Sequence, residues 1–288
     1  MCSESDEGTM LADHGLSRRE ATAPTVTGMA AGGAEAATRQ AMVSERAVDI
    51  RTADGTCDAV LLHAGDKPAP AVIWYPDGFG LRQAHVDMGK RLAAEGYAVL
   101  VINPFYRARP APVHPPGFDF NNPADREQGL KLIAMLDHDA VLRDASSFVA
   151  FLDAQAEVNP KAKIGAVGYC MGGAMTVRAQ FAAPDRVQAS ASFHGGSLVT
   201  DDANSPHRLV ARTKGAYHIA IGIDDDEKQP EAKPVMAQAL DDAGRPYTQE
   251  VYPGAKHGWM VPDRPVYDHD QAERGWTAML RLYKQALV

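Results

Sequence analysis

A cysteine flanked by glycines is the residue of this sequence whose surroundings most favour chemistry. It stands in the run Gly168-Tyr169-Cys170-Met171-Gly172-Gly173. The residues before it, 163–167, are mostly apolar and predict a buried strand, whereas residues 172–183 predict a helix. A G-x-C-x-G segment between strand and helix is typical of a nucleophile elbow, in which glycines let the backbone turn sharply. Because the thiol would lie at a helix start, where the helix dipole favours thiolate, we predict that Cys170 is a nucleophile.

A nucleophilic thiol needs a base, and the best candidate is His257. It follows a predicted strand and lies among turn residues in the run 254–259. In sheets of this kind the expected chain order is nucleophile, acid, histidine, which His257 satisfies. His194, at the end of another predicted strand, is the second candidate, and we interpret it as a residue that lines the pocket.

The base in turn needs a carboxylate to orient it. Three acids, Asp224, Asp225 and Asp226, follow the predicted strand 217–221, and a run of carboxylates is most often a solvated loop. Counting from the strand end favours Asp225.

The oxyanion formed on attack needs backbone N–H donors, each worth about 3 kcal/mol of transition-state stabilisation. Met171, directly after Cys170, offers one donor and Gly78, after an earlier strand, offers the second. Asp77 beside Gly78 could steer the thiol or contact substrate, although the run 76–78 is also a good turn. Five further residues lie near predicted strand ends and are expected to contact substrate with Asp77: Phe79, Tyr106, Arg107, His194 and Trp259.

The elements that would position these residues alternate between strands and helices. A predicted hairpin, 48–51 with 57–63, precedes the strands 71–75, 98–102, 164–167, 189–193, 217–221 and 248–252. Helices are expected over 83–95, 138–156, 172–183, 231–243 and 269–286. This alternation predicts an α/β fold whose central sheet is mostly parallel, with helices on both faces. The run 109–117 predicts an irregular loop over the crevice.

The composition restricts the partners. The chain has 288 residues, of which 45% are hydrophobic and 23% charged, with a net charge of −8. This acidity argues against nucleic acid or an anionic membrane surface, and no apolar run is long enough for a membrane span. Cys2, Cys57 and Cys170 are too scattered for a disulfide framework or a zinc site, and Cys57 is expected to be a buried structural thiol.

The first 44 residues predict a leader, ahead of a single domain over 45–288. Arg18-Arg19 followed by the uncharged stretch 21–34 resembles a degenerate twin-arginine export signal, with a processing site near Ala34-Glu35-Ala36. The alternative is a disordered tail. The protein is accordingly expected in the cytoplasm, or in the periplasm if the signal works.

Over residues 45–288 the chain resembles the dienelactone hydrolases (carboxymethylenebutenolidases), a cysteine branch of the α/β-hydrolases. The resemblance rests on the run 168–173 around Cys170 and on Tyr252-Pro253-Gly254-Ala255-Lys256-His257-Gly258. It implies an α/β-hydrolase fold, a triad of Cys170, Asp225 and His257, and an oxyanion hole of Met171 and Gly78. It also implies that no metal or organic cofactor is needed.

The sequence departs from the best-known members of that family at two places. They carry a glutamate where Asp77 stands, and an arginine where Val261 stands, with Arg264 lying further on. Their other substrate-binding arginine would correspond to Arg107 or Arg109. These differences favour a substrate other than dienelactone.

The expected activity is hydrolysis of a small ester or lactone through a thioester on Cys170, by a monomer or small homo-oligomer. The alternatives are a scaffold that only binds a small ligand and a redox-active cysteine protein. A complete Cys, Asp, His set in the expected order favours the hydrolase, and no partner cysteine lies near Cys170.

Overall fold

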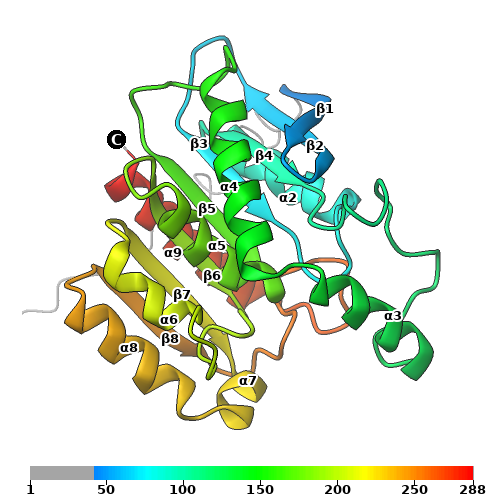
Figure 1. Cartoon of the computed structure of the whole chain (residues 1–288), viewed down its shortest axis with the longest axis vertical. Coiled ribbons are helices and arrows are strands. Elements are labelled where there is room, and N and C mark those ends of the chain that lie inside the picture. Colours follow the sequence, from blue (N-terminus) through cyan, green and yellow to red (C-terminus); the bar gives the residue numbers. More distant parts are fainter. Residues whose placement is uncertain (1–41, 288) are drawn as a thin grey trace, which may run out of the picture.

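The computed structural model describes residues 42–287 as one eight-stranded sheet with helices on both faces (Figure 1). The strands, in chain order, are β1 (Val43–Thr52), β2 (Gly55–Ala64), β3 (Ala71–Tyr75), β4 (Ala98–Ile102), β5 (Ile164–Tyr169), β6 (Val187–Phe193), β7 (Ala216–Gly222) and β8 (Tyr247–Tyr252). Their order across the sheet is β1-β2-β4-β3-β5-β6-β7-β8. The β1–β2 and β2–β4 pairs are antiparallel and the others are parallel, which confirms the predicted mostly parallel sheet.

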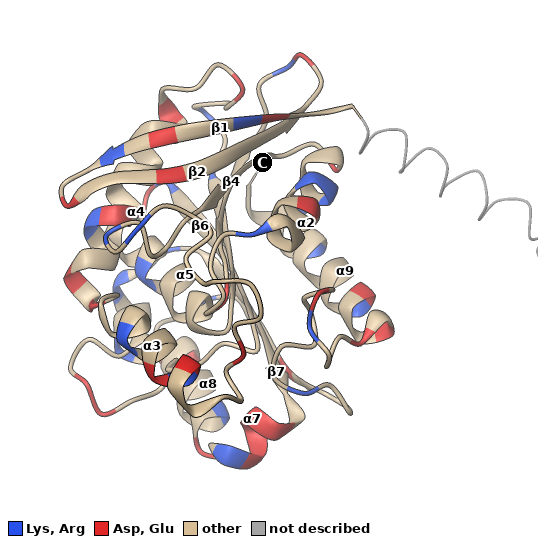
Figure 2. Ribbon diagram, turned by 90° about the vertical axis from the view of Figure 1, so that its right-hand side faces the viewer, with Lys and Arg blue, Asp and Glu red and all other residues tan. Residues whose placement is uncertain are grey.

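The helices are α2 (Gln83–Ala94), α3 (Pro123–Ala134), α4 (His138–Asp153), α5 (Met171–Ala182), α6 (Pro206–Leu209), α7 (Ile223–Lys228), α8 (Ala232–Asp242) and α9 (His269–Ala286), with a short 3-10 turn at Val210–Arg212. In the edge-on view of Figure 2, α2 and α9 lie on one side of the sheet and α4 and α5 on the other. Strands β3, β4 and β5 are buried along their whole length because both of their faces are covered. Among the described residues, no helix is long and apolar enough to span a bilayer.

The predicted elements are confirmed with small shifts at their ends, and the structure adds others. The hairpin strands run further in both directions than predicted. Helix α3 was not predicted, nor were the short helices α6 and α7, and α7 contains the acidic run that we expected in a loop. The buried state of Cys57 is confirmed, because its side chain is fully inaccessible. The predictions for Cys2, Arg18, Arg19 and the leader lie outside the described residues, apart from 42–44.

Parallel strands place their carboxyl ends at one edge of the sheet. The residues that follow β3, β5, β6, β7 and β8 therefore meet at this edge, and every predicted triad and oxyanion residue follows one of these strands.

Candidate active site

The chain turns sharply at Cys170, between the end of β5 and the start of α5. Cys170 has φ 54° and ψ −120°, a backbone conformation that non-glycine residues rarely adopt. A Cβ at Gly168 would lie 2.0 Å from the Gly172 carbonyl oxygen, and one at Gly172 would lie 2.5 Å from the Tyr75 carbonyl oxygen. Side chains at these two positions would collide with backbone, so the glycines are what allows the turn.

His257 lies in the loop after β8 and is held by two carboxylates. Its Nδ1 lies 2.9 Å and 3.0 Å from the two carboxylate oxygens of Asp225. Its backbone N–H donates to Oδ1 of Asp224 at 2.7 Å, whereas Asp226 pairs with Lys233. The three neighbouring acids therefore have three separate partners, and Asp225 is the one on the imidazole ring.

The imidazole ring of His257 has a raised pKa in this site. Burial works against the charged ring, but hydrogen bonds to Asp225 and Cys170 outweigh it and raise the pKa of His257 to about 10. With Nδ1–H donated to Asp225, the other ring nitrogen is left for the thiol.

His194, directly after β6, lies between these groups. Its Nδ1 accepts the Cys170 backbone N–H at 3.1 Å, and its ring is 4.9 Å from that of His257 in an edge-to-face arrangement. Burial and the nearby charge of His257 hold the pKa of His194 well below its ordinary value. The ring is therefore neutral and carries its proton on Nε2, which is buried without a partner among the described residues.

Two backbone N–H groups are available beside the thiol. Within residues 42–287, neither Met171 N–H nor Gly78 N–H donates to a protein acceptor, although the Gly78 carbonyl contacts the His114 ring at 2.9 Å. The first turn of α5 packs against the backbone of Tyr75 and Pro76, the two residues before Asp77 and Gly78.

Gly78, Cys170, His194 and His257 line a cavity of about 440 Å³. Its lining residues are Asp77, Gly78, Phe79, Phe120, Asn121, Arg126, Leu130, Ile133, Cys170, His194, His257, Gly258, Arg264, Pro265 and Val266. The cavity is thus mostly apolar, with the thiol and imidazole in its wall.

Helix α3 supplies one side of this wall. Arg126, Leu130 and Ile133 all belong to it, and the sequence analysis missed them. The signal was Asn122-Pro123: the Asn122 side chain accepts N–H bonds from Ala124 and Asp125, and a proline follows at the first helical position.

Two arginines in the cavity have no carboxylate partner among the described residues. They are Arg126, on α3, and Arg264, which follows His257 in the sequence. The Arg264 guanidinium lies 3.8 Å from the centre of the Phe79 ring. The cavity therefore carries positive charge that an anionic ligand could balance.

Asp77 also lines the cavity, but its carboxylate is already bound. Arg82 donates to both of its oxygens at 2.7 Å and 3.0 Å, and the Phe79 N–H donates to Oδ1 at 2.9 Å. Although burial acts to raise it, the nearby His85 and Arg82 hold the pKa of Asp77 well below its usual range. In this arrangement the Asp77 carboxylate stabilises the turn to which it belongs, through its contacts with the Phe79 N–H and Arg82.

Three predicted substrate contacts lie outside the cavity and need correction. Tyr106 donates to Asp144, and Arg107 binds Asp144 and Asp54, so both belong to a polar network that joins the loop after β4 to α4 and to the β1–β2 turn. Trp259 is fully buried and stacks on Tyr252 at 4.6 Å between ring centres. Phe79 and His194 do line the cavity.

The sheet order and the strand–turn–helix elbow together define an α/β-hydrolase. The model of the dienelactone hydrolase family matches residues 57–287. The chain therefore belongs to the dienelactone hydrolase family and is a hydrolase of ester or lactone bonds.

Known relatives agree with this assignment. The "Putative carboxymethylenebutenolidase" of Synechocystis sp. is 27% identical over 76% of this chain and 87% of its own length. The carboxymethylenebutenolidase of Pseudomonas putida is 27% identical over 52% of this chain and 61% of its own length. The crystal structure of the "Putative Dienelactone Hydrolase" of Klebsiella pneumoniae subsp. pneumoniae superposes with a TM-score of 0.73 at 22% identity, covering 84% of this chain and 99% of that one, and so supports the fold.

Proposed function

We propose that the protein cleaves its ester or lactone through a covalent thioester on Cys170, with His257 and Asp225 as its partners. The observation that carries the proposal is the bidentate contact of Asp225 with Nδ1 of a histidine that lies beside the elbow cysteine in one cavity. An oriented histidine next to a thiol is the arrangement that nucleophilic catalysis requires.

In the acylation step, the thiolate of Cys170 attacks the carbonyl carbon and the carbonyl oxygen becomes an oxyanion. The N–H groups of Met171 and Gly78, which have no protein acceptor among the described residues, would stabilise that charge. Collapse of the tetrahedral intermediate breaks the bond to the alkoxy oxygen, and His257 gives this oxygen its proton. In a lactone, the released hydroxyl stays attached to the acyl group.

In the deacylation step, neutral His257 takes a proton from water as the water oxygen attacks the thioester carbon. The carbon–sulfur bond then breaks, the acid leaves, and the proton on His257 restores the ion pair with the Cys170 thiolate. Asp225 keeps the same ring nitrogen protonated throughout.

The cavity favours a substrate that carries a carboxylate as well as the ester. Arg126 and Arg264 supply the positive charge, and Phe79, Phe120 and Leu130 supply an apolar surface for the rest of the molecule.

We expect 4-acetoxybenzoate to have a lower KM than phenyl acetate. Arg264→Gln should reduce the ratio of these two KM values by about tenfold. Arg208→Gln, on the exposed surface of α6, is the matched control. Equal KM values for the two esters would contradict the anionic preference.

The thiol mechanism is tested by substitution at Cys170 and Asp225. Cys170→Ala should abolish hydrolysis of p-nitrophenyl acetate and of small lactones while the fold is kept, and Cys170→Ser should retain little activity. Asp225→Asn should lower kcat by about 10³-fold or more, whereas Asp226→Asn should have little effect. Intact-mass measurement should show an acyl adduct on the wild type. Turnover by Cys170→Ala would sink the proposal.

A further inference from the structure

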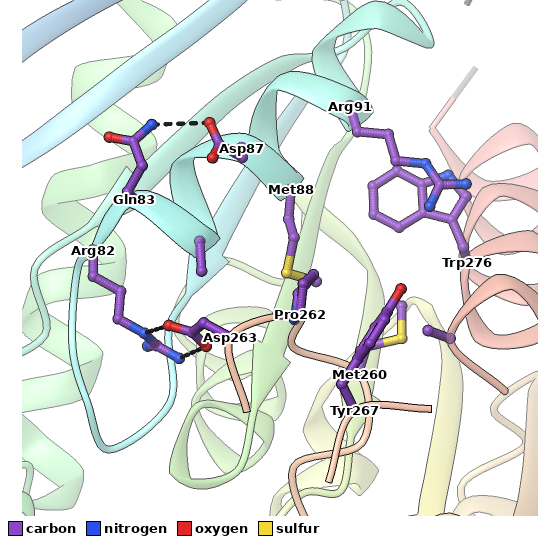
Figure 3. Close-up of a pocket in the computed structure, with 12 residues that line it drawn as sticks. Arg82, Gln83, Asp87, Met88, Arg91, Met260, Pro262, Asp263, Tyr267 and Trp276 are labelled. Carbon is purple, nitrogen blue, oxygen red and sulfur yellow. Dashed lines mark hydrogen bonds and ion pairs between the residues drawn. The ribbon is translucent and has the colours of Figure 1, made fainter. Parts of the chain in front are cut away.

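Arg82, directly before α2, binds two carboxylates that are far apart in the sequence. It donates to Asp77 through Nη1 and Nη2, at 2.7 Å and 3.0 Å. It also donates to Asp263 through Nε and Nη2, at 2.6 Å and 2.9 Å, as Figure 3 shows. Fork-like contacts of this kind fix orientation as well as distance.

The two carboxylates belong to the two segments that flank the reacting groups. Asp77 directly precedes Gly78, and its Oδ1 also accepts the Phe79 N–H at 2.9 Å. Asp263 lies in the segment 258–267, which follows His257 and contributes Arg264 to the cavity wall. One guanidinium therefore joins the turn that carries a proposed oxyanion donor to the segment that follows the catalytic histidine.

The Asp263 end of this link is only loosely packed. Arg82 and Asp263 line a second cavity of about 620 Å³, together with Met88, Met260 and Trp276 (Figure 3). The Asp263 side chain is 40% exposed. The turn itself packs through Leu81 and against Phe120. Because the link to Asp263 borders open space, it depends on the Arg82 hydrogen bonds more than on packing.

We infer that Arg82 is a positioning residue, which holds the Gly78 N–H in register with the carbonyl oxygen of the substrate on Cys170. The inference rests on the proposed function. An oxyanion donor acts only when it is aligned in advance, and misplacement by about 1 Å can cost about 10²-fold in rate. His257 is held separately by Asp224 and Asp225, so the loss of Arg82 should disturb the oxyanion hole more than the thiol and its base.

The test compares two reactions of Cys170 in Arg82→Gln and Asp263→Asn. Hydrolysis of p-nitrophenyl acetate needs the oxyanion hole, whereas alkylation by iodoacetamide needs only the thiol and its base. Arg82→Gln should lower kcat by about 10²-fold, with KM changed by less than about threefold and the alkylation rate by less than about twofold. Asp263→Asn, which keeps the pair with Asp77, should lower kcat by about fivefold. Arg82→Lys should retain only part of the wild-type activity.

Arg91→Gln is the matched control. Arg91 belongs to α2, lines the same second cavity and pairs with Glu273, but it does not contact the Gly78 turn. Its kcat should equal that of the wild type. Equal losses of hydrolysis and alkylation in Arg82→Gln, or an equal loss of kcat in Arg91→Gln, would overturn the inference. If Arg82→Gln does not fold, the rates of hydrolysis and of alkylation measured for Asp263→Asn test the inference instead.

Hydrogen exchange separates this inference from the proposed function. Arg82→Gln should raise amide exchange in both 76–82 and 258–268, and Arg91→Gln should leave both unchanged. Unaltered exchange in Arg82→Gln would overturn the link even in an active enzyme. A wild-type protein that turns over no ester would instead overturn the proposed function, and exchange would still decide whether Arg82 joins the two segments.

Discussion

At the scale of single residues, the site separates groups that look alike in the sequence. Asp224, Asp225 and Asp226 are adjacent, yet only Asp225 contacts the imidazole ring. Asp224 accepts the His257 backbone N–H and pairs with Lys228, and Asp226 pairs with Lys233. Counting from the strand end selected Asp225 correctly as the partner of the ring. Two histidines that meet edge to face differ as strongly, because hydrogen bonds to Asp225 and Cys170 raise the pKa of His257, whereas burial lowers the pKa of His194.

The raised pKa of His257 makes part of the folding stability depend on pH. Since the pKa is raised from 6.5 to about 10 by folding, the protonated ring stabilises the folded state fully below about pH 6.5. This contribution should decline as the pH rises and be lost above about pH 10. We expect the thermal midpoint of the wild type to exceed that of His257→Gln most at pH 6 and least at pH 10. A difference that stays constant over this range would contradict the assignment.

At the scale of elements, the elbow depends on the close approach of α5 to the loop after β3. Gly168 meets the backbone of Gly172 and Gly172 meets that of Tyr75, so neither contact can be relieved by moving a side chain. The strain at Cys170 is thus maintained by two neighbouring backbones.

Gly168→Ala should therefore be strongly destabilising, because its Cβ would lie 2.0 Å from a carbonyl oxygen. We expect a loss of about 3 kcal/mol in the free energy of unfolding, measured by urea denaturation. Gly196→Ala is the matched control, since nothing lies within 4 Å of its Cβ, and its effect should stay within about 1 kcal/mol. Similar effects of the two substitutions would show that crowding does not shape the elbow.

The same elements explain what the sequence could and could not predict. Strands such as β3 and β4 are continuous apolar runs, and the order of Cys170, Asp225 and His257 follows from their place after such runs. Helix α3 has no such signal, because it buries only Gly129 and lacks a continuous apolar face. Its cavity residues Arg126 and Leu130 were missed for this reason. Arg107 was misplaced because a position after a strand does not tell which way a side chain points.

At the scale of the whole molecule, Arg107 connects three parts of the chain. It donates to both oxygens of Asp144 on α4 at 2.8 Å and to Asp54, in the turn between β1 and β2, at 2.6 Å. Tyr106 donates to the same Asp144 at 2.6 Å. The network ties the antiparallel edge of the sheet to the layer of α4.

Removal of Arg107 should act on stability and not on substrate binding. Arg107→Ala would leave the nearly buried Asp144 carboxylate without its cation, at a cost of about 3 kcal/mol. Arg143→Ala, which removes a more exposed partner of Asp54, should cost less than about 1 kcal/mol. Both free energies can be measured by urea unfolding, and KM should be unchanged in each variant. A raised KM in Arg107→Ala would place this arginine at the substrate after all.

In the sequence, helix α3 lies between β4 and α4, in a segment that supplies none of the proposed reacting groups. The residues proposed to carry out the reaction and many of the residues that line the cavity therefore lie in different stretches of the sequence. A change at Arg126 or Leu130 could redirect the enzyme to a new ester while the groups proposed to break the bond keep their positions. In this molecule, selectivity can evolve separately from chemistry.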